Sequence, residues 1–143
     1  MKASNNLIDY IRTTEGYHDK LYISDYEDCI GYGHRGKTEH ESLSEEEAYQ
    51  LLLNDINRIE KYLNILKVEW TQNQFDACVD FIYCLGLDAF MRSVLRRNIV
   101  TKKKIDHKCF TGWHYVYDGE KFLSSEKKVA RRAWEWARWS GEI

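Results

Sequence analysis

The chain has 143 residues, of which 43% are hydrophobic, 31% charged and 14% aromatic. This length suits one domain with a substantial core, and the composition excludes a disordered tail. The absence of proline excludes a proline-rich linker. No stretch approaches the ~20 consecutive apolar residues of a membrane span, so we expect no stable membrane insertion.

The formal net charge of −2 hides an asymmetry between the two halves of the chain. Residues 1–70 carry a net charge of −6, and residues 71–143 carry a net charge of +4. The basic half could help the protein approach an anionic polymer, or it could be a solvated face without a partner. Residues 102–104 are all lysines, but no nucleic-acid-binding module surrounds them, so we expect no nucleic-acid partner.

The sequence contains four cysteines: Cys29, Cys78, Cys84 and Cys109. None of them forms a CxxC pair, which argues against zinc and iron–sulfur centres, and we expect neither a metal nor a cofactor. The N-terminus lacks an apolar run of signal-peptide length, because Asp9 and Arg12 interrupt it. We therefore expect synthesis in a reducing cytosol, where the thiols stay free.

The first residues predict a helix followed by a hairpin. Ser4 is a good N-cap, and the apolar residues after it recur at helical spacing as far as Thr14. Residues 17–34 differ, because aromatic and β-branched residues flank the polar segment 24–28. This pattern is typical of a small β-hairpin or meander.

Two helices with marked starts follow. Ser44 and Glu47 can form a capping box, and apolar residues then recur at helical spacing for about 22 residues. Thr71 and Gln74 can form a second capping box. The helix that begins there should end at Gly86, a plausible C-cap.

The rest of the chain predicts shorter helices, a turn and a final helix. We expect helical pieces over residues 88–98 and 103–112, a turn at Asp118-Gly119, and a last helix from near Ser124 to about Trp139. Together these elements predict an α+β, mostly helical fold with one small sheet near its N-terminal end.

We expect one domain, residues 1–143, in two lobes. The N-terminal lobe would cover about 15–43, and a connecting helix about 44–66. The C-terminal lobe would cover about 70–143 together with the N-terminal helix. A cleft between two such lobes is a common place for a site.

Glu15 is the first candidate for chemistry, because it lies between the predicted N-terminal helix and the hairpin. A carboxylic acid half covered by apolar neighbours can have its pKa raised enough to donate a proton near neutral pH. Most glutamates at helix ends are solvated, however, so position alone leaves both interpretations open.

The residues that follow Glu15 in the sequence resemble those of one enzyme family. Glu15-Gly16, Tyr22 and the run Cys29-Ile30-Gly31-Tyr32-Gly33-His34 are similar to the active-site stretch of the phage-type lysozymes, glycoside hydrolase family 24. Residues 44–48, 71–77 and 131–135 resemble that family's connecting helix, the start of its C-terminal lobe and its final helix. The resemblance runs from about residue 4 to residue 139 and implies a lysozyme-like fold of two lobes.

The resemblance also implies a reaction, the hydrolysis of the β-1,4 bond between N-acetylmuramic acid and N-acetylglucosamine in bacterial peptidoglycan. Glu15 would protonate the departing glycosidic oxygen. An aspartate would stabilise positive charge on the sugar and help to direct water, and a threonine would position that water. Glycoside cleavage commonly uses two such carboxyl groups.

The sequence departs from the family's spacing at the second carboxyl group. The family's aspartate position falls on Ser24, and its threonine position holds Cys29, one residue early. We place the second carboxylate at Asp25, with Asp28 as the alternative and Ser24 as an uncharged occupant. Cys29 would take part in the site or be a small strand residue. A cysteine-protease pair with His34 is disfavoured, because five residues along one strand put the two on opposite faces.

Further residues complete the predicted site. We expect His34 to pair with Asp55 of the connecting helix, which is a structural role. Tyr32, Gly33 and Trp113 are expected to contact the substrate. Four aromatic side chains could either stack on the apolar face of a sugar or pack in the core: Tyr83, Trp113, Tyr115 and Tyr117.

The leading prediction is a metal-independent muramidase, a bacteriolytic endolysin that lyses the host of a bacteriophage. It would accumulate as a monomer in the host cytoplasm and reach the glycan strands of the cell wall after a holin opens the membrane. One alternative is a lytic transglycosylase, in which Glu15 acts on the same bond as acid and then as base. The other is a peptidoglycan-binding or virion module, in which the departures at Ser24 and Cys29 mark a decayed site.

Overall fold

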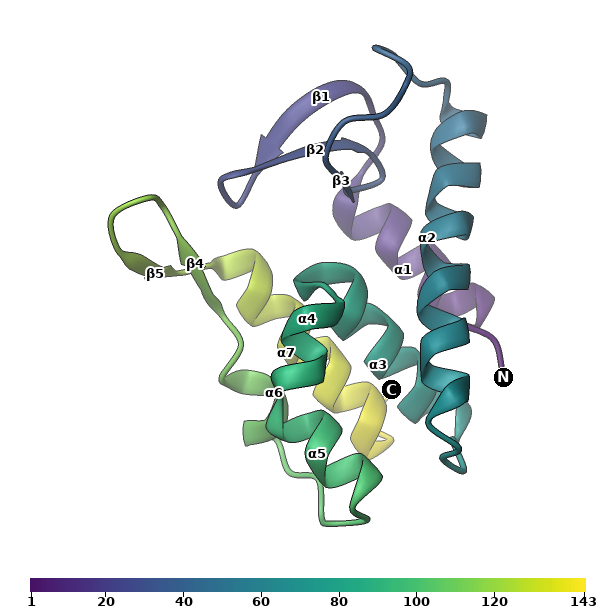
Figure 1. Cartoon of the computed structure of the whole chain (residues 1–143), viewed down its shortest axis with the longest axis vertical. Coiled ribbons are helices and arrows are strands. Elements are labelled where there is room, and N and C mark those ends of the chain that lie inside the picture. Colours follow the sequence, from purple (N-terminus) through teal and green to yellow (C-terminus); the bar gives the residue numbers. More distant parts are fainter.

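The computed structural model describes residues 1–143 and confirms the predicted α+β, mostly helical class. Figure 1 shows a small sheet at one end, a group of helices at the other, and the long helix α2 running alongside both. The seven helices are α1 (Asn5–Glu15), α2 (Glu45–Ile65), α3 (Gln72–Leu85), α4 (Leu87–Arg92), α5 (Val94–Val100), α6 (Lys108–Thr111) and α7 (Glu126–Ser140). The five strands are β1 (His18–Ser24), β2 (Glu27–Gly31), β3 (His34–Arg35), β4 (Tyr115–Tyr117) and β5 (Phe122–Ser124).

Helix α1 begins and ends for local reasons, as predicted. The Ser4 hydroxyl accepts a hydrogen bond from the Leu7 N–H, which satisfies one of the free donors of the first turn. Leu7 and Ile11 are buried and hold the helix against the core. The helix ends at Glu15 because Gly16 turns the chain with a φ of 71°.

The predicted hairpin forms the antiparallel sheet β1-β2-β3. Ser24 pairs with Glu27, so the turn between the first two strands consists of Asp25 and Tyr26 alone. Both turn residues have positive φ, at 48° and 65°. A two-residue turn of this kind matches the twist of the strands but normally selects Asn, Asp or Gly.

Both predicted capping boxes are present. At the start of α2, Ser44 and Glu47 exchange hydrogen bonds between side chain and backbone, and Thr71 and Gln74 do the same at the start of α3. Helix α3 ends at Gly86, as predicted. These bonds fix where the connecting helix and the central helix of the second lobe begin.

The C-terminal half differs from the prediction in three places, the first being that the helix expected over 103–112 is only the short α6. The helix expected over 88–98 is two helices, because Ser93 takes an extended conformation between them. The expectation of a single sheet was wrong, since Asp118-Gly119 connects the strands of a second, two-stranded sheet, β4-β5. These strands have three residues each, too few for alternation to mark them.

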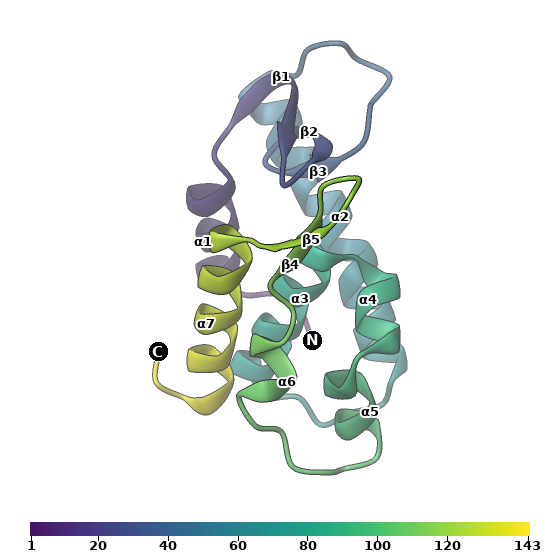
Figure 2. The same cartoon turned by 90° about the vertical axis from the view of Figure 1, so that its left-hand side faces the viewer.

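Helix α3 is the centre of the core. Nine of its 14 residues are buried, and it packs against both α2 and α7. Figure 2 shows α7 lying beside α1 below the sheet, where the rings of Tyr10 and Trp134 stack with centroids 4.0 Å apart. The four cysteines are buried and unpaired. None of the helices combines the length and apolar character that crossing a membrane requires.

Candidate active site

The Glu15 side chain lies at the junction of α1, the sheet and α7, and only 5% of it is exposed. Its Oε1 accepts a hydrogen bond of 2.7 Å from Arg131, and its Oε2 accepts one of 2.8 Å from the Lys127 ammonium. Both cations belong to α7, more than 100 residues away along the chain. A buried carboxyl with paired oxygens at such a junction has a fixed position, which acid–base chemistry requires.

Arg131 is itself anchored in the core. Its guanidinium, 1% exposed, donates two hydrogen bonds to Asp80 of α3, which is fully buried. Burial alone would raise the pKa of the Asp80 carboxyl, but the charge and hydrogen bonds of Arg131 outweigh it and lower that pKa. The position of Glu15 therefore depends on a buried ion pair behind it.

Gly33 makes room for the acid. Its φ is 82°, and a Cβ at this position would lie 2.7 Å from the carboxyl carbon of Glu15. That distance is far inside van der Waals contact. The run that resembles the family motif thus requires glycine here for space as well as for backbone conformation.

The hairpin turn brings Asp25 to the same site. Its carboxylate accepts hydrogen bonds from Lys128 Nζ at 3.1 Å and from the Ser125 hydroxyl at 3.0 Å. Burial by itself would raise the pKa of Asp25, but Lys128, with smaller contributions from Ser125 and Lys127, holds it below its ordinary value. Asp25 is therefore a carboxylate at neutral pH.

Lys127 closes the space between the two sides of the site. Its ammonium also donates to the Ser24 hydroxyl at 3.1 Å, so a single cation bridges the acid and the hairpin. The hollow that Glu15, Ser24, Asp25 and Cys29 help to line has a volume of only about 20 Å³. That is room for about one water molecule, so the hollow does not admit a sugar in this arrangement of side chains.

Cys29 lies beside the acid as a neutral thiol. Burial raises the pKa of its thiol, with opposing contributions from the nearby charges of Lys127 and Glu15. A thiol in that state is a poor nucleophile. Asp28, the alternative second carboxylate, is exposed on β2 and does not line the hollow.

The comparisons with known proteins agree with this geometry. The family model described as phage lysozyme matches residues 12–135. This chain belongs to the phage lysozyme family. An endolysin of Bacillus phage B103 is 39% identical over 101 residues, which cover 66% of this chain and 38% of that protein. An endolysin of Salmonella phage P22 is 32% identical over 111 residues, which cover 71% of this chain and 75% of that protein.

Solved structures of this fold cover the chain from end to end. An endolysin from the Escherichia coli O157:H7 phage FAHEc1 has a TM-score of 0.82 at 27% identity, covering 100% of this chain and 96% of that one. The muramidase domain of SpmX from Asticaccaulis excentricus has a TM-score of 0.80 at 28% identity, covering 96% of each chain. The chain spans 38% of the length of the Bacillus phage B103 relative, which therefore contains more than the part matched here.

The predicted partner of His34 is confirmed in this member of the phage lysozyme family. His34 Nδ1 lies 2.6 Å from an Asp55 carboxylate oxygen, and the pair connects β3 to α2. Both residues line an open pocket of about 340 Å³ between the sheet and the helices, together with Gly33 and Tyr83. This pocket adjoins the hollow at Glu15 through Gly33 and Tyr83, which line both.

Two residues that were expected to contact substrate do not line the pockets beside Glu15. Tyr32 is only 4% exposed, and its hydroxyl donates to Glu45 at 2.9 Å, so its ring has no free face for a sugar. Trp113 packs edge-on against Phe81 and lines neither pocket beside Glu15. Gly33 is at the site, but its role there is to admit the acid.

The cations of α7 had no predicted role in the site, and Tyr22 was known only as part of the motif that resembles the family. Lys127, Lys128 and Arg131 supply charges to the carboxyl groups of the site. The Tyr22 hydroxyl is buried without a hydrogen-bond partner, and burial raises its pKa, with the charge of Glu15 adding to the shift. No group of three or more His, Cys, Asp or Glu side chains is arranged to hold a metal ion.

Proposed function

We propose that this chain is a muramidase endolysin, which hydrolyses the β-1,4 bond between N-acetylmuramic acid and N-acetylglucosamine in peptidoglycan. The observation that carries the proposal is the buried Glu15 carboxyl, fixed by Arg131 at the end of α1 and facing a second carboxylate on the sheet. Two carboxyl groups around one bond are what glycoside cleavage commonly uses.

The first chemical step is a proton transfer from Glu15 to the glycosidic oxygen. The carboxyl must therefore carry a proton, and one of its oxygens must be released by a cation. Lys127 is the cation that can leave, because its side chain is 34% exposed whereas that of Arg131 is 1% exposed. Movement of Lys127 would free Oε2 and would also open the space occupied by the sugar.

Asp25 and Cys29 serve the second half of the reaction. As the C–O bond breaks, positive charge develops on the sugar, and the Asp25 carboxylate stabilises it electrostatically. Water then adds to the anomeric carbon and gives up a proton to one of the two carboxylates, and the product keeps a free reducing end. We assign to the Cys29 thiol, which lines the same hollow, a weak hydrogen bond that orients this water.

One observation favours a second candidate, a lytic transglycosylase. The hairpin residue that shares the Lys127 ammonium with Glu15 is the neutral Ser24, whereas Asp25 is engaged by Lys128 and Ser125. With Glu15 as the only acid–base group, the C6 hydroxyl of the muramic acid would attack instead of water. The product would then be an anhydro sugar, lighter by one water.

Digestion of purified sacculi tests both candidates. Glu15→Gln should lower the clearing rate by about 10²–10⁴-fold, the usual contribution of a general acid. Equal residual clearing by both proteins would support the non-catalytic binding module instead. Mass spectrometry of the released muropeptides should find reducing ends, and anhydromuropeptides would assign the transglycosylase.

We further propose that the protein acts as a monomer after release from the host cytoplasm through a holin. What supports this proposal is the likeness of the chain to endolysins of phages. Host cells that express the chain should keep it in the cytoplasmic fraction until a holin is co-expressed, and lysis without a holin would contradict this route.

A further inference from the structure

The β4-β5 hairpin carries an aromatic face that the chemistry at Glu15 does not use. Tyr115 and Tyr117 share one side of β4, and Phe122 pairs with Tyr117 across the sheet. These three rings are 56%, 54% and 70% exposed, whereas Val116 faces the opposite side and is buried. The centroids of the Tyr117 and Phe122 rings lie 5.1 Å apart, so the two rings form one surface.

Trp113 extends this surface at the base of the hairpin. It lines an open groove of about 500 Å³ together with Gly112, Tyr115 and Phe122. The Trp113 ring is held in the core by an edge-on contact with Phe81, at a centroid distance of 5.9 Å. One wall of the groove is therefore rigid, and the other stands on the projecting hairpin.

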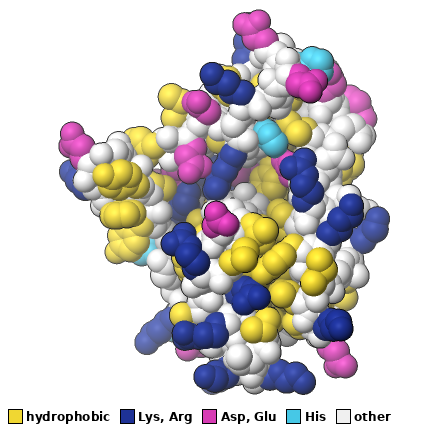
Figure 3. Space-filling model, viewed as in Figure 1, with side chains coloured by type: hydrophobic (Ala, Val, Ile, Leu, Met, Phe, Trp, Pro, Cys, Tyr) yellow, Lys and Arg dark blue, Asp and Glu magenta, His cyan; other side chains and the backbone are white.

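The hairpin that carries the aromatic face leads along the chain directly into a residue of the candidate active site. Ser125 follows β5 directly, caps α7 and donates a hydrogen bond to Asp25. A strand rises about 3.3 Å per residue, so Phe122 lies within about 10 Å of Ser125. Figure 3 shows apolar side chains on the projecting hairpin and others at the centre of the molecule, on the same face. A polymer bound at Glu15 that continued in this direction would pass over the rings.

We propose that the aromatic platform, defined as Trp113, Tyr115, Tyr117 and Phe122, binds sugar rings of the glycan strand beyond the bond that is cleaved. This inference rests on the proposed function. A pyranose ring has an apolar face of C–H groups, and rigid aromatic rings cover such a face at a low cost in conformational entropy. The tyrosine hydroxyls at the rim can hydrogen-bond the sugar's hydroxyl groups.

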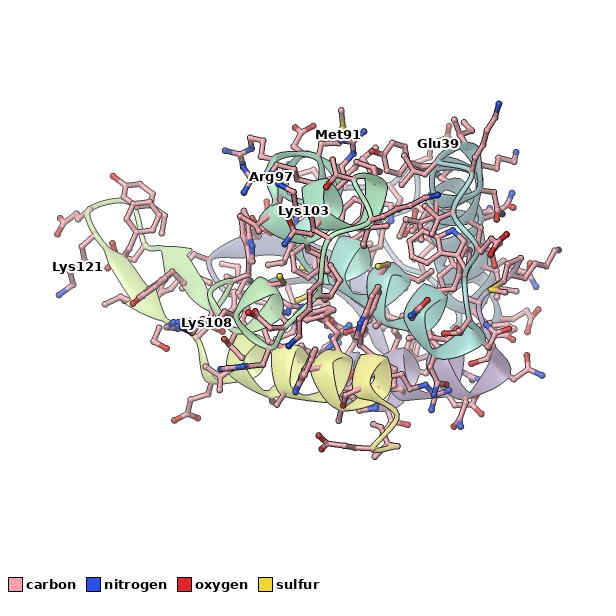
Figure 4. All side chains as sticks on the ribbon, turned by 90° about the horizontal axis from the view of Figure 1, so that it is seen from below. Glu39, Met91, Arg97, Lys103, Lys108 and Lys121 are labelled. Carbon is pink, nitrogen blue, oxygen red and sulfur yellow. The ribbon has the colours of Figure 1, made fainter.

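A protein partner fits this surface less well. Asp118, Glu120 and Lys121 surround the rings at the tip of the hairpin, which Figure 4 shows projecting away from the helices with Lys121 at its end. A specific protein–protein interface buries about 1,200 Å² or more, which a short hairpin with a charged tip does not offer. A narrow glycan strand needs no more than a row of rings.

Sedimentation with purified sacculi tests the platform without hydrolysis. All variants carry Glu15→Gln, so that the strands remain intact and binding is measured apart from catalysis. Adding Tyr117→Ser and Phe122→Ser should weaken binding about tenfold, as expected when two anchoring aromatic contacts are lost. The matched control is Ile65→Ser with Val94→Ser, two exposed apolar residues on α2 and α5, and it should bind like the parent.

The outcomes separate the platform from the proposed function. Unchanged binding by the Tyr117 and Phe122 variant, with an unchanged circular dichroism spectrum, would overturn the platform. So would a dimer of the parent that this variant converts to a monomer in analytical ultracentrifugation, since the rings would then serve a second copy of the chain. Platform-dependent binding by a protein with Glu15 intact that releases no muropeptides would leave the platform standing and refute the proposed hydrolase.

Discussion

The two carboxyl groups of the site are held in different ways. Glu15 ends a helix packed into the core, and its partner Arg131 is anchored by a fully buried aspartate. Asp25 occupies a two-residue turn, and its partners Ser125 and Lys128 belong to the first turn of α7. The acid's position is thus set by the core, whereas the second carboxylate's position is set by a few contacts between the lobes. The Asp25 side is therefore the part that can move when substrate enters.

The largest effect should come from Arg131→Met. It leaves the buried Asp80 without its cation, and removing one partner of a buried pair costs about 3–5 kcal/mol. Arg132→Met is the matched control, because Arg132 forms an equally buried pair with Glu135. Urea unfolding should show a similar loss of stability for both variants.

Only the Arg131 variant should also lose activity per folded molecule, since Arg132 makes no contact with Glu15. Arg131→Lys and Arg132→Lys provide gentler forms of the same comparison if the methionine variants do not fold. Equal specific activities of the two folded variants would mean that the acid does not depend on the core.

Gly33→Ala should have the second-largest effect. Its φ of 82° makes any side chain cost about 1–2 kcal/mol, and the new methyl group would also displace Glu15. Gly36→Ala is the control, with a φ of 89° and no atom within 4 Å of its Cβ. Both variants should lose similar stability, but Gly33→Ala alone should lose about 10²-fold in kcat/KM, the scale expected for a misplaced catalytic group. Equal kcat/KM values would contradict the tight fit at the acid.

Asp25→Asn should have a smaller effect on stability, and one that depends on pH. Because folding lowers the pKa of Asp25 from its ordinary value of 3.8, its contribution is complete above that value and is lost as the pH falls through the folded pKa. The melting temperatures of the two proteins should therefore differ at neutral pH and converge in acid. Asp28→Asn is the control, because it replaces an exposed carboxylate beside the same turn, and it should leave the melting temperature at neutral pH unchanged.

The smallest expected effect is an increase in stability. Tyr26 has a φ of 65°, a left-handed conformation that costs a non-glycine residue about 1 kcal/mol or more. Tyr26→Gly would give the Asp-Gly turn that two-residue hairpins prefer, and should raise the stability by about 0.5–1 kcal/mol. Thermal unfolding would measure this increase. A decrease in stability would show that the contacts of the Tyr26 ring contribute more than the backbone strain costs.

Local signals in the sequence predicted much of the fold. Ser4, Ser44 and Thr71 each cap a helix through groups within three residues, so the sequence contains the whole interaction. The strands of β4-β5 were missed because three residues are too few for a pattern. The aspartate–glycine turn between them was visible, but the pairing it produces was not inferred.

Some residues of the site were predicted from the sequence, but the cations that pair with its carboxyl groups were not. Glu15 followed from the resemblance, and the pair His34–Asp55 was predicted as a contact between the sheet and the connecting helix. Lys127 lies 112 residues from Glu15, and nothing in a lysine pair at the start of a helix indicates which carboxyl groups it will meet. Such contacts depend on how α7 packs against α1 and the hairpin, which no local pattern encodes.

The fit between Gly33 and Glu15 has a consequence for how such proteins diverge. The two positions change as a unit, because a side chain gained at the glycine must push the acid out of place. A descendant that keeps the glutamate but replaces the glycine should have lost hydrolytic activity, although its catalytic side chains are all present. Surveys of phage genomes could therefore use this chemically inert position to separate working lytic enzymes from descendants retained for other purposes.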